Sequence, residues 1–128
     1  MSKEKHKDII YENAVIVAAH LDEQTVSSLN EEINELLLLA DTAGAKILDK
    51  IIQRKTKIDP STFIGSGKVK SAINNAKELN CTAIIFNDEL SPVQLKNIQK
   101  IAGDQLKIID RTGLILDIFE KHAKTRES

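Results

Sequence analysis

Aromatic residues are scarce in this chain of 128 residues, which has no tryptophan and an aromatic content of only 3%. Proteins that hold single-stranded nucleic acid commonly stack its bases on aromatic side chains, so this composition argues against a base-stacking platform. An excess of charge of one sign is also lacking, because the formal net charge is −1. Binding to nucleic acid would therefore have to use local clusters of lysine and arginine.

Cysteine occurs only once, as Cys81, which excludes an intramolecular disulfide. Since Cys81 adjoins an apolar run, we interpret it as a buried thiol in a reducing compartment. The longest apolar run is too short to span a membrane. The charged residues 1–8 do not resemble a signal peptide. We therefore predict a cytoplasmic protein without a membrane partner.

The chain is long enough for one domain with a substantial core, and its 41% hydrophobic content is ordinary for a globular protein. Short apolar runs typical of buried strands alternate with segments of helical periodicity. This alternation predicts βαβ units, a parallel sheet and helices on both faces. The strand candidates are 14–19, 82–86 and 107–109, and the helical segments lie within 25–42, 69–79, 91–102 and 112–128.

One segment fits two structures. The apolar residues Ile47, Leu48, Ile51 and Ile52 match a helical face at least as well as a strand. Its flanking breaks, at Gly44 and at residues 59–60, allow either. Periodicity alone therefore leaves this segment open.

The last helical segment has an apolar face wider than a single sheet contact needs. We expect Thr112 to cap it, and no stop signal follows before the end of the sequence. A missing packing partner would explain the wide face. That partner could come from further along a longer chain or from a second copy of the chain. A slightly overfilled terminal helix explains the same pattern without any partner.

Two glycines and a lysine lie directly before a probable helix, at Gly65, Ser66, Gly67 and Lys68. A helix amino terminus has unpaired N–H groups and partial positive charge, so it favours anions such as phosphate. The spacing is neither that of a P-loop nor that of the dinucleotide-binding fingerprint. A turn that only starts a helix is the simpler interpretation of the same residues.

Acidic residues follow three of the strand candidates, at Asp22, at Asp88 with Glu89, and at Asp110. Ligands of parallel sheets bind outside the carboxyl ends of the strands, so Asp88 and Asp110 are weak candidates for a metal or for acid–base chemistry. Such residues more often cap helices. The three histidines, His6, His20 and His122, have no metal-ligand spacing with one another or with Cys81, so we predict no metal site.

Four stretches, taken together and in order, resemble the N-terminal domain of HflX-type GTPases. The stretches are 37–45, 59–69, 86–95 and 110–119. The likeness runs from about the first strand candidate to the end of the sequence. It implies that residues 45–57 form a strand at the edge of the sheet.

With this resemblance, we expect a three-layer α/β fold with a mostly parallel four-stranded sheet in the order 2-1-3-4 and helices on both faces. Residues 1–11 would be a flexible terminus, 12–111 the α/β domain, and 112–128 a helix leading towards a helical hairpin. The resemblance implies a longer parent with a G domain that binds GTP and magnesium. It also implies association with the large ribosomal subunit, in some members during stress, and adenine nucleotide such as ATP at this domain in some members.

The sequence contains neither GxxxxGK[ST] nor the Asn-Lys-x-Asp motif for guanine recognition, so we expect no GTPase activity from this chain on its own. Three functions remain open. The first is a ribosome-binding module. The second is a nucleotide-binding or ATP-hydrolysing domain with phosphates at residues 65–68. The third is a spacer that orients the hairpin and the G domain, with the glycines needed only for backbone geometry. The candidate contacts to ribosomal RNA are Arg54, Lys55, Lys57, Lys70 and Arg111.

Overall fold

The computed structural model describes residues 12–127, with side chains as far as Lys121. The predicted flexible terminus, residues 1–11, lies outside the described residues. Strands and helices alternate along the chain. They are β1 (Asn13–Leu21), α2 (Val26–Thr42), β2 (Lys46–Lys55), α3 (Ser66–Glu78), β3 (Ala83–Phe86), α4 (Pro92–Ala102), β4 (Lys107–Asp110) and α5 (Arg111–Glu127).

The four strands form one sheet in the order β2-β1-β3-β4, and every neighbouring pair is parallel. This confirms the predicted strand order. β1 lies inside the sheet, and its residues Ala14–Ala18 are fully buried because helices cover both faces. The strand order reverses between β1 and β3, which is where ligands of open parallel sheets usually bind.

The segment that periodicity left open is a strand, β2, at the edge of the sheet. Its pattern is mixed because only one neighbour pairs with it and the helices cover it incompletely. Ile47 and Ile51 pack against the two cores on opposite faces, whereas Leu48 and Ile52 are exposed. A register shift between Ala14 and Val15 of β1 leaves Leu48 without a partner across the ladder.

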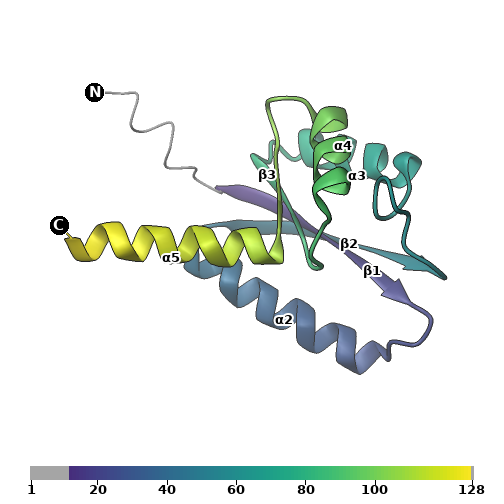
Figure 1. Ribbon diagram of the computed structural model, residues 1–128, viewed down its shortest axis with the longest axis horizontal. Coiled ribbons are helices and arrows are strands. Elements are labelled where there is room, and N and C mark those ends of the chain that lie inside the picture. Colours follow the sequence, from purple (N-terminus) through teal and green to yellow (C-terminus); the bar gives the residue numbers. More distant parts are fainter. Residues whose placement is uncertain (1–11, 128) are drawn as a thin grey trace.

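Helices cover both faces of the sheet, as expected (Figure 1). The larger core lies between α3, α4 and one face of the sheet, where Val17, Phe86 and Ile98 are almost fully buried. The second core lies between α2, α5 and the opposite face, around Leu36 and Leu114. The buried thiol of Cys81 belongs to the first core, and this burial raises its pKa.

Helix α5 begins directly after β4, so the expectation that Thr112 caps it is wrong. Asp110 performs this role, because its Oδ1 accepts a hydrogen bond from the N–H of Gly113 at 2.8 Å. The side chain of Asp110 stands before the first turn of the helix and therefore reaches an unpaired N–H group there.

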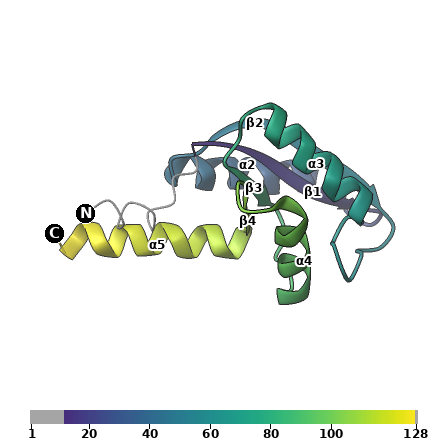
Figure 2. The same cartoon turned by 90° about the horizontal axis from the view of Figure 1, so that it is seen from above.

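The later turns of α5 extend beyond the rest of the domain (Figure 2). Leu114 is buried against α2 and the sheet, whereas Leu116 and Phe119 are 57% and 67% exposed. The wide apolar face predicted for this helix is therefore only partly covered by the described residues. Within residues 12–127, no helix is long and apolar enough to cross a membrane.

Candidate functional site

The glycine turn, residues 65–68, forms the amino terminus of α3. Gly65 is the N-cap residue, with φ of +96° and no side chain that caps the helix. The amides of the first turn therefore point outward without intrahelical partners. A Cβ atom added at Gly67 would meet no other part of the chain within 4 Å. Ser66 and Gly67 are exposed, so solvent or an anion can reach this first turn.

The loop before the turn is held by hydrogen bonds. The Oδ1 of Asp59 accepts from the N–H groups of Ser61 and Thr62, at 2.7 and 2.9 Å. These bonds lower the pKa of the Asp59 carboxyl, and the bond from Thr62 has the larger effect. Gln94 of α4 donates to the carbonyl of Asp59 at 2.8 Å, and Asn97 donates to the carbonyl of Ser61 at 3.1 Å. Helix α4 therefore fixes the loop that leads to the turn.

An aromatic pair anchors the same loop in the core. Phe63 has a positive φ of 71°, which is rare for an aromatic residue. Its ring lies edge-on to Phe86 of β3, with centroids 5.9 Å apart and an interplanar angle of 84°. Both side chains are buried. This packing holds a backbone conformation that would otherwise be unfavourable.

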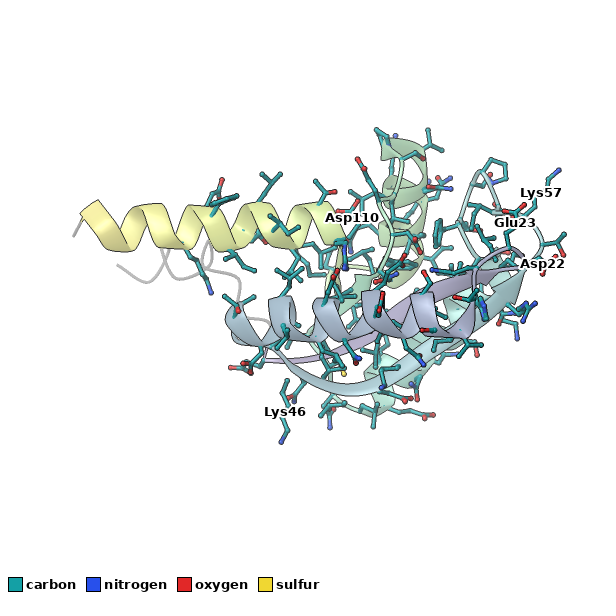
Figure 3. All side chains as sticks on the ribbon, turned by 90° about the horizontal axis from the view of Figure 1, so that it is seen from below. Asp22, Glu23, Lys46, Lys57 and Asp110 are labelled. Atoms are coloured by element: carbon teal, nitrogen blue, oxygen red, sulfur yellow. The ribbon has the colours of Figure 1, made fainter. Side chains whose placement is uncertain are left out.

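The basic residues expected to contact RNA do not form a single cluster. Arg54 lies 3.4 Å from Asp22, and both side chains are exposed. Lys57 lies at the same end of the molecule as Asp22 and Glu23, whereas Lys46 starts β2 at its opposite end (Figure 3). This edge of the sheet is therefore of mixed charge.

Lys68 and Lys70 point to different sides of α3, because residues two positions apart on a helix do not share a face. Lys68 lines a groove over β2 together with Asp49 and Gln53. Lys70 is exposed outside that groove. The two side chains therefore cannot contact the same small ligand.

Arg111 belongs to an internal network. Its guanidinium donates to the carbonyl of Glu32 at 3.2 Å, to the carboxylate of Glu35 at 3.1 Å and to Oδ1 of Asn87 at 3.5 Å. Glu32 in turn accepts from Asn87 at 2.9 Å and from Gln24 at 3.1 Å. These residues join α2, β3 and α5 at the carboxyl edge. Sequence reasoning gave Glu32 and Asn87 no role: Glu32 lies outside the four stretches, and Asn87 lies within the stretch 86–95 without a spacing that links it to Glu32 or Arg111.

The two weak metal candidates, Asp110 and Asp88, differ in what their carboxylates do. Asp110 uses both carboxylate oxygens on backbone N–H groups, those of Gly113 and Leu90, each at 2.8 Å. The Oδ2 of Asp88 is buried and has no hydrogen-bond partner among the described residues. Burial raises the pKa of Asp88, and the neighbouring charge of Glu32 raises it further. In the part of the chain that the structure describes, no group of three or more acidic, His or Cys side chains could hold a metal ion.

Replacing each glycine of the turn with alanine should change the free energy of unfolding differently. Gly65→Ala should lower the free energy of unfolding by roughly 1–3 kcal/mol, because its backbone conformation suits only glycine. Gly67→Ala should leave it unchanged or raise it by up to about 1 kcal/mol, because Gly67 is helical and its Cβ meets open space. Urea unfolding of both variants measures the difference. Equal losses would contradict the geometry of the turn.

The parallel sheet, its paired helix layers and the open turn define an α/β domain of the open-sheet class. Residues 30–120 match the family described as GTP-binding GTPase N-terminal. The chain is 40% identical over 119 residues to a GTPase HflX of Lacrimispora saccharolytica, covering 92% of this chain and 27% of the relative. It is 34% identical over 97 residues to GTPase HflX of Escherichia coli, covering 76% of this chain and 22% of the relative. The chain belongs to the family of HflX-type GTPase N-terminal domains.

Solved structures share the fold at low sequence identity. A GTP-binding protein from Sulfolobus solfataricus in complex with GDP has a TM-score of 0.62 and 20% identity, over 84% of this chain and 30% of that one. A crystal structure of an SsGBP–GDP complex has a TM-score of 0.64 and 20% identity, over 87% of this chain and 29% of that one. The chain thus spans 22–30% of the length of these proteins and of the relatives above.

Proposed function

We propose that this domain helps an HflX-type GTPase to associate with the large ribosomal subunit, and that its glycine turn binds phosphate. The observation that carries the proposal is the open amino terminus of α3, where Gly65 and Gly67 leave the first-turn amides accessible. Helix amino termini of this kind attract phosphate through their N–H groups and partial positive charge. The phosphate could belong to ribosomal RNA or to a nucleotide.

The basic residues near the carboxyl edge support contact with ribosomal RNA. Among the described residues, Lys55, Lys57 and Lys70 form no ion pair, whereas the guanidinium of Arg54 is paired with the carboxylate of Asp22. Lysines that neutralise RNA phosphates release counterions, so binding of this kind weakens as salt rises. Arg111 contributes indirectly, because its guanidinium is occupied by Glu32 and Glu35.

A bound nucleotide is the second candidate, with ATP implied by some relatives and GTP with magnesium belonging to the G domain of a longer parent. Gly67 favours it, because neither its φ nor any steric contact requires glycine at that position. Glycine at this position would allow a ligand to approach the backbone closely, which explains its presence there. The spacer interpretation, in which Gly67 serves only backbone geometry, lacks support at this residue.

The exposed apolar side chains of α5 fit a further element of a longer HflX-type chain. Leu116 and Phe119 present apolar surface to solvent, although Ile118, which lies between them in the sequence, packs against the second core. A second helix packed along α5, as in a helical hairpin, would cover them. Self-association of two copies through α5 would cover them equally, and sedimentation of the isolated domain at increasing concentration distinguishes the two arrangements.

Co-sedimentation of the 128-residue chain with purified large ribosomal subunits tests the leading proposal. We expect pelleting that weakens with salt, and a Lys57→Glu variant that binds less and loses roughly one unit of the slope of log K against log salt. Lys46→Glu makes the same charge change at the opposite end of β2 and should bind as the unaltered chain does. Equal losses in both variants would show only a general charge effect. No pelleting at any salt would favour the spacer role.

A further inference from the structure

The helices on the two faces of the sheet differ in charge. Helix α2 has four acidic residues and neither lysine nor arginine. Helices α3 and α4, which cover the other face of the sheet (Figure 1), together have five lysines and one acidic residue, Glu78. The formal net charge of −1 does not show this separation of charge across the sheet. A polyanion would be attracted to the side of α3 and α4 and repelled by the side of α2.

Four of these lysines lie on one surface. In α3, Lys68 lines the groove over β2, so Lys70 and Lys77 lie on the other side of this helix, towards α4, which it contacts. The interval of seven residues between them corresponds to two helical turns, about 10 Å. In α4, Lys96 and Lys100 lie one turn apart, on the side away from the buried residues of that helix. The outer surface of the two adjacent helices therefore carries two lysines from each.

These four lysines are available to bind an anion. All four are exposed, and none forms an ion pair among the described residues. A helix face that only contacts solvent commonly pairs lysine with an acid three or four positions away, but Lys70, Lys77 and Lys96 have no acid at that spacing. Lys96 and Lys100 are four residues apart, so their like charges repel each other in the free domain. A bound polyanion would remove this repulsion.

The side chains of this surface suit a phosphate backbone better than unstacked bases. Helices α3 and α4 contain no aromatic residue, whereas proteins that hold single-stranded nucleic acid commonly stack its bases on aromatic rings. Asn74 is exposed on the same side of α3, between Lys70 and Lys77. Its amide can donate to or accept from a ribose 2′-hydroxyl. Phosphates and 2′-hydroxyls are the groups through which double-stranded RNA is mainly recognised.

We propose that the outer surface of α3 and α4 binds the phosphate backbone of an RNA duplex and is the face through which the domain contacts ribosomal RNA. This inference rests on the proposed association with the large ribosomal subunit and names the part of the domain that makes the contact. It does not involve the glycine turn. The acidic helix α2 would face away from the RNA, so the separation of charge orients the domain as it approaches.

Two binding measurements on the 128-residue chain test this face: fluorescence polarisation with a labelled RNA duplex of about 20 base pairs, and co-sedimentation with large ribosomal subunits. We expect the double variant Lys96→Glu, Lys100→Glu to bind the duplex about tenfold more weakly at low salt and to lose about two units of the slope of log K against log salt. The double variant Lys46→Glu, Lys50→Glu makes the same change in net charge at exposed positions of β2, outside this face, and should bind almost as tightly as the unaltered chain.

A second pair of substitutions extends the test to α3. Lys70→Ala with Lys77→Ala removes two charges from the same surface without adding repulsion, and it should also weaken binding of the duplex and of the subunits. Alanine favours the helix at these exposed positions, so this variant should fold even if the glutamate pair in α4 does not. Circular dichroism checks that each variant is folded.

The outcomes separate this inference from the proposed function. Subunit binding that the α4 and β2 double variants retain equally, or lose equally, would overturn the α3–α4 face and leave the association with the ribosome standing. Subunit binding without any binding of RNA duplex would overturn RNA as the partner of this face and indicate an acidic protein surface instead. Tighter binding of single-stranded RNA of the same length would overturn recognition of a duplex. No binding of subunits or of duplex by the unaltered chain would overturn both proposals.

Discussion

Replacing Phe86 with alanine is expected to lower the free energy of unfolding by about 3–5 kcal/mol. Phe86 is 1% exposed, lies in β3 inside the sheet, and belongs to the larger core. Alanine there would remove a large apolar side chain and leave a cavity that the surrounding sheet cannot close. It would also remove the ring against which Phe63 packs.

The loss of that ring should also destabilise the loop that leads to the glycine turn. Phe63 holds its positive φ through packing on Phe86, so amide exchange in residues 59–65 should accelerate more than a uniform loss of stability explains. Phe86→Leu keeps most of the volume and should cost clearly less. Urea unfolding measures the stability, and hydrogen exchange measures the loop. A loop that keeps its relative protection in the alanine variant would show that Asp59, Gln94 and Asn97 suffice to hold it.

Replacing Arg111 with alanine is expected to lower the free energy of unfolding by about 2–3 kcal/mol. The Arg111 side chain is 22% exposed, and it is the cation recorded beside Glu32, Glu35 and Asp88 in the described residues. Its removal would take away the positive charge beside those acids, together with the side-chain hydrogen bonds to the Glu32 carbonyl and the Glu35 carboxylate. Arg54→Ala, which breaks the exposed pair with Asp22, is the matched control and should cost less than about 1 kcal/mol.

A second substitution identifies the cause of the Arg111 effect. Burial raises the pKa of Asp88 above its ordinary value of 3.8, the charge of Glu32 adds to the rise, and Arg111 opposes it. The folded state therefore holds its Asp88 proton to higher pH than the unfolded state, so this group costs stability as the pH rises through its folded pKa. In the Arg111→Ala background, Asp88→Asn should recover part of the loss at neutral pH.

The same linkage predicts a pH dependence. The deficit of Arg111→Ala should shrink as the pH falls from neutrality towards 3.8, because Asp88 is then protonated in the folded state and no longer needs the positive charge of Arg111. Urea unfolding at neutral and mildly acidic pH measures this trend. A deficit that stays constant with pH, together with no recovery by Asp88→Asn, would assign the loss to the contacts with the Glu32 carbonyl and Glu35 instead.

Local signals were sufficient where neighbouring residues alone decide the structure. Ser91, Pro92 and Gln94 predict the start of α4, and the structure shows the capping box they form. Gln94 also illustrates the limit of such signals. Its side chain both closes the cap and donates to Asp59, 35 residues away, and no pattern around residue 94 indicates that second bond.

The edge strand and the two polar sites depended on tertiary packing. β2 has a sequence compatible with a helix and becomes a strand because β1 pairs with it from Lys46 to Lys55, with Leu48 alone left out at the register shift. The Arg111 network joins residues from α2, β3 and α5, and the groove joins α3 to β2. These residues lie far apart in the chain and carry no shared spacing, so their proximity follows only from the order of the strands.

The sequence by itself therefore determined the class of the fold and its family, because alternating periodicities and four ordered motifs are local properties of the chain. It also located the glycine turn, whose residues are consecutive. Tertiary structure alone decided that Gly65 and not Gly67 requires a positive φ, that Lys68 faces β2, and that Arg111 points inward. Each of these depends on where separate elements meet, and contacts across the sheet settle that.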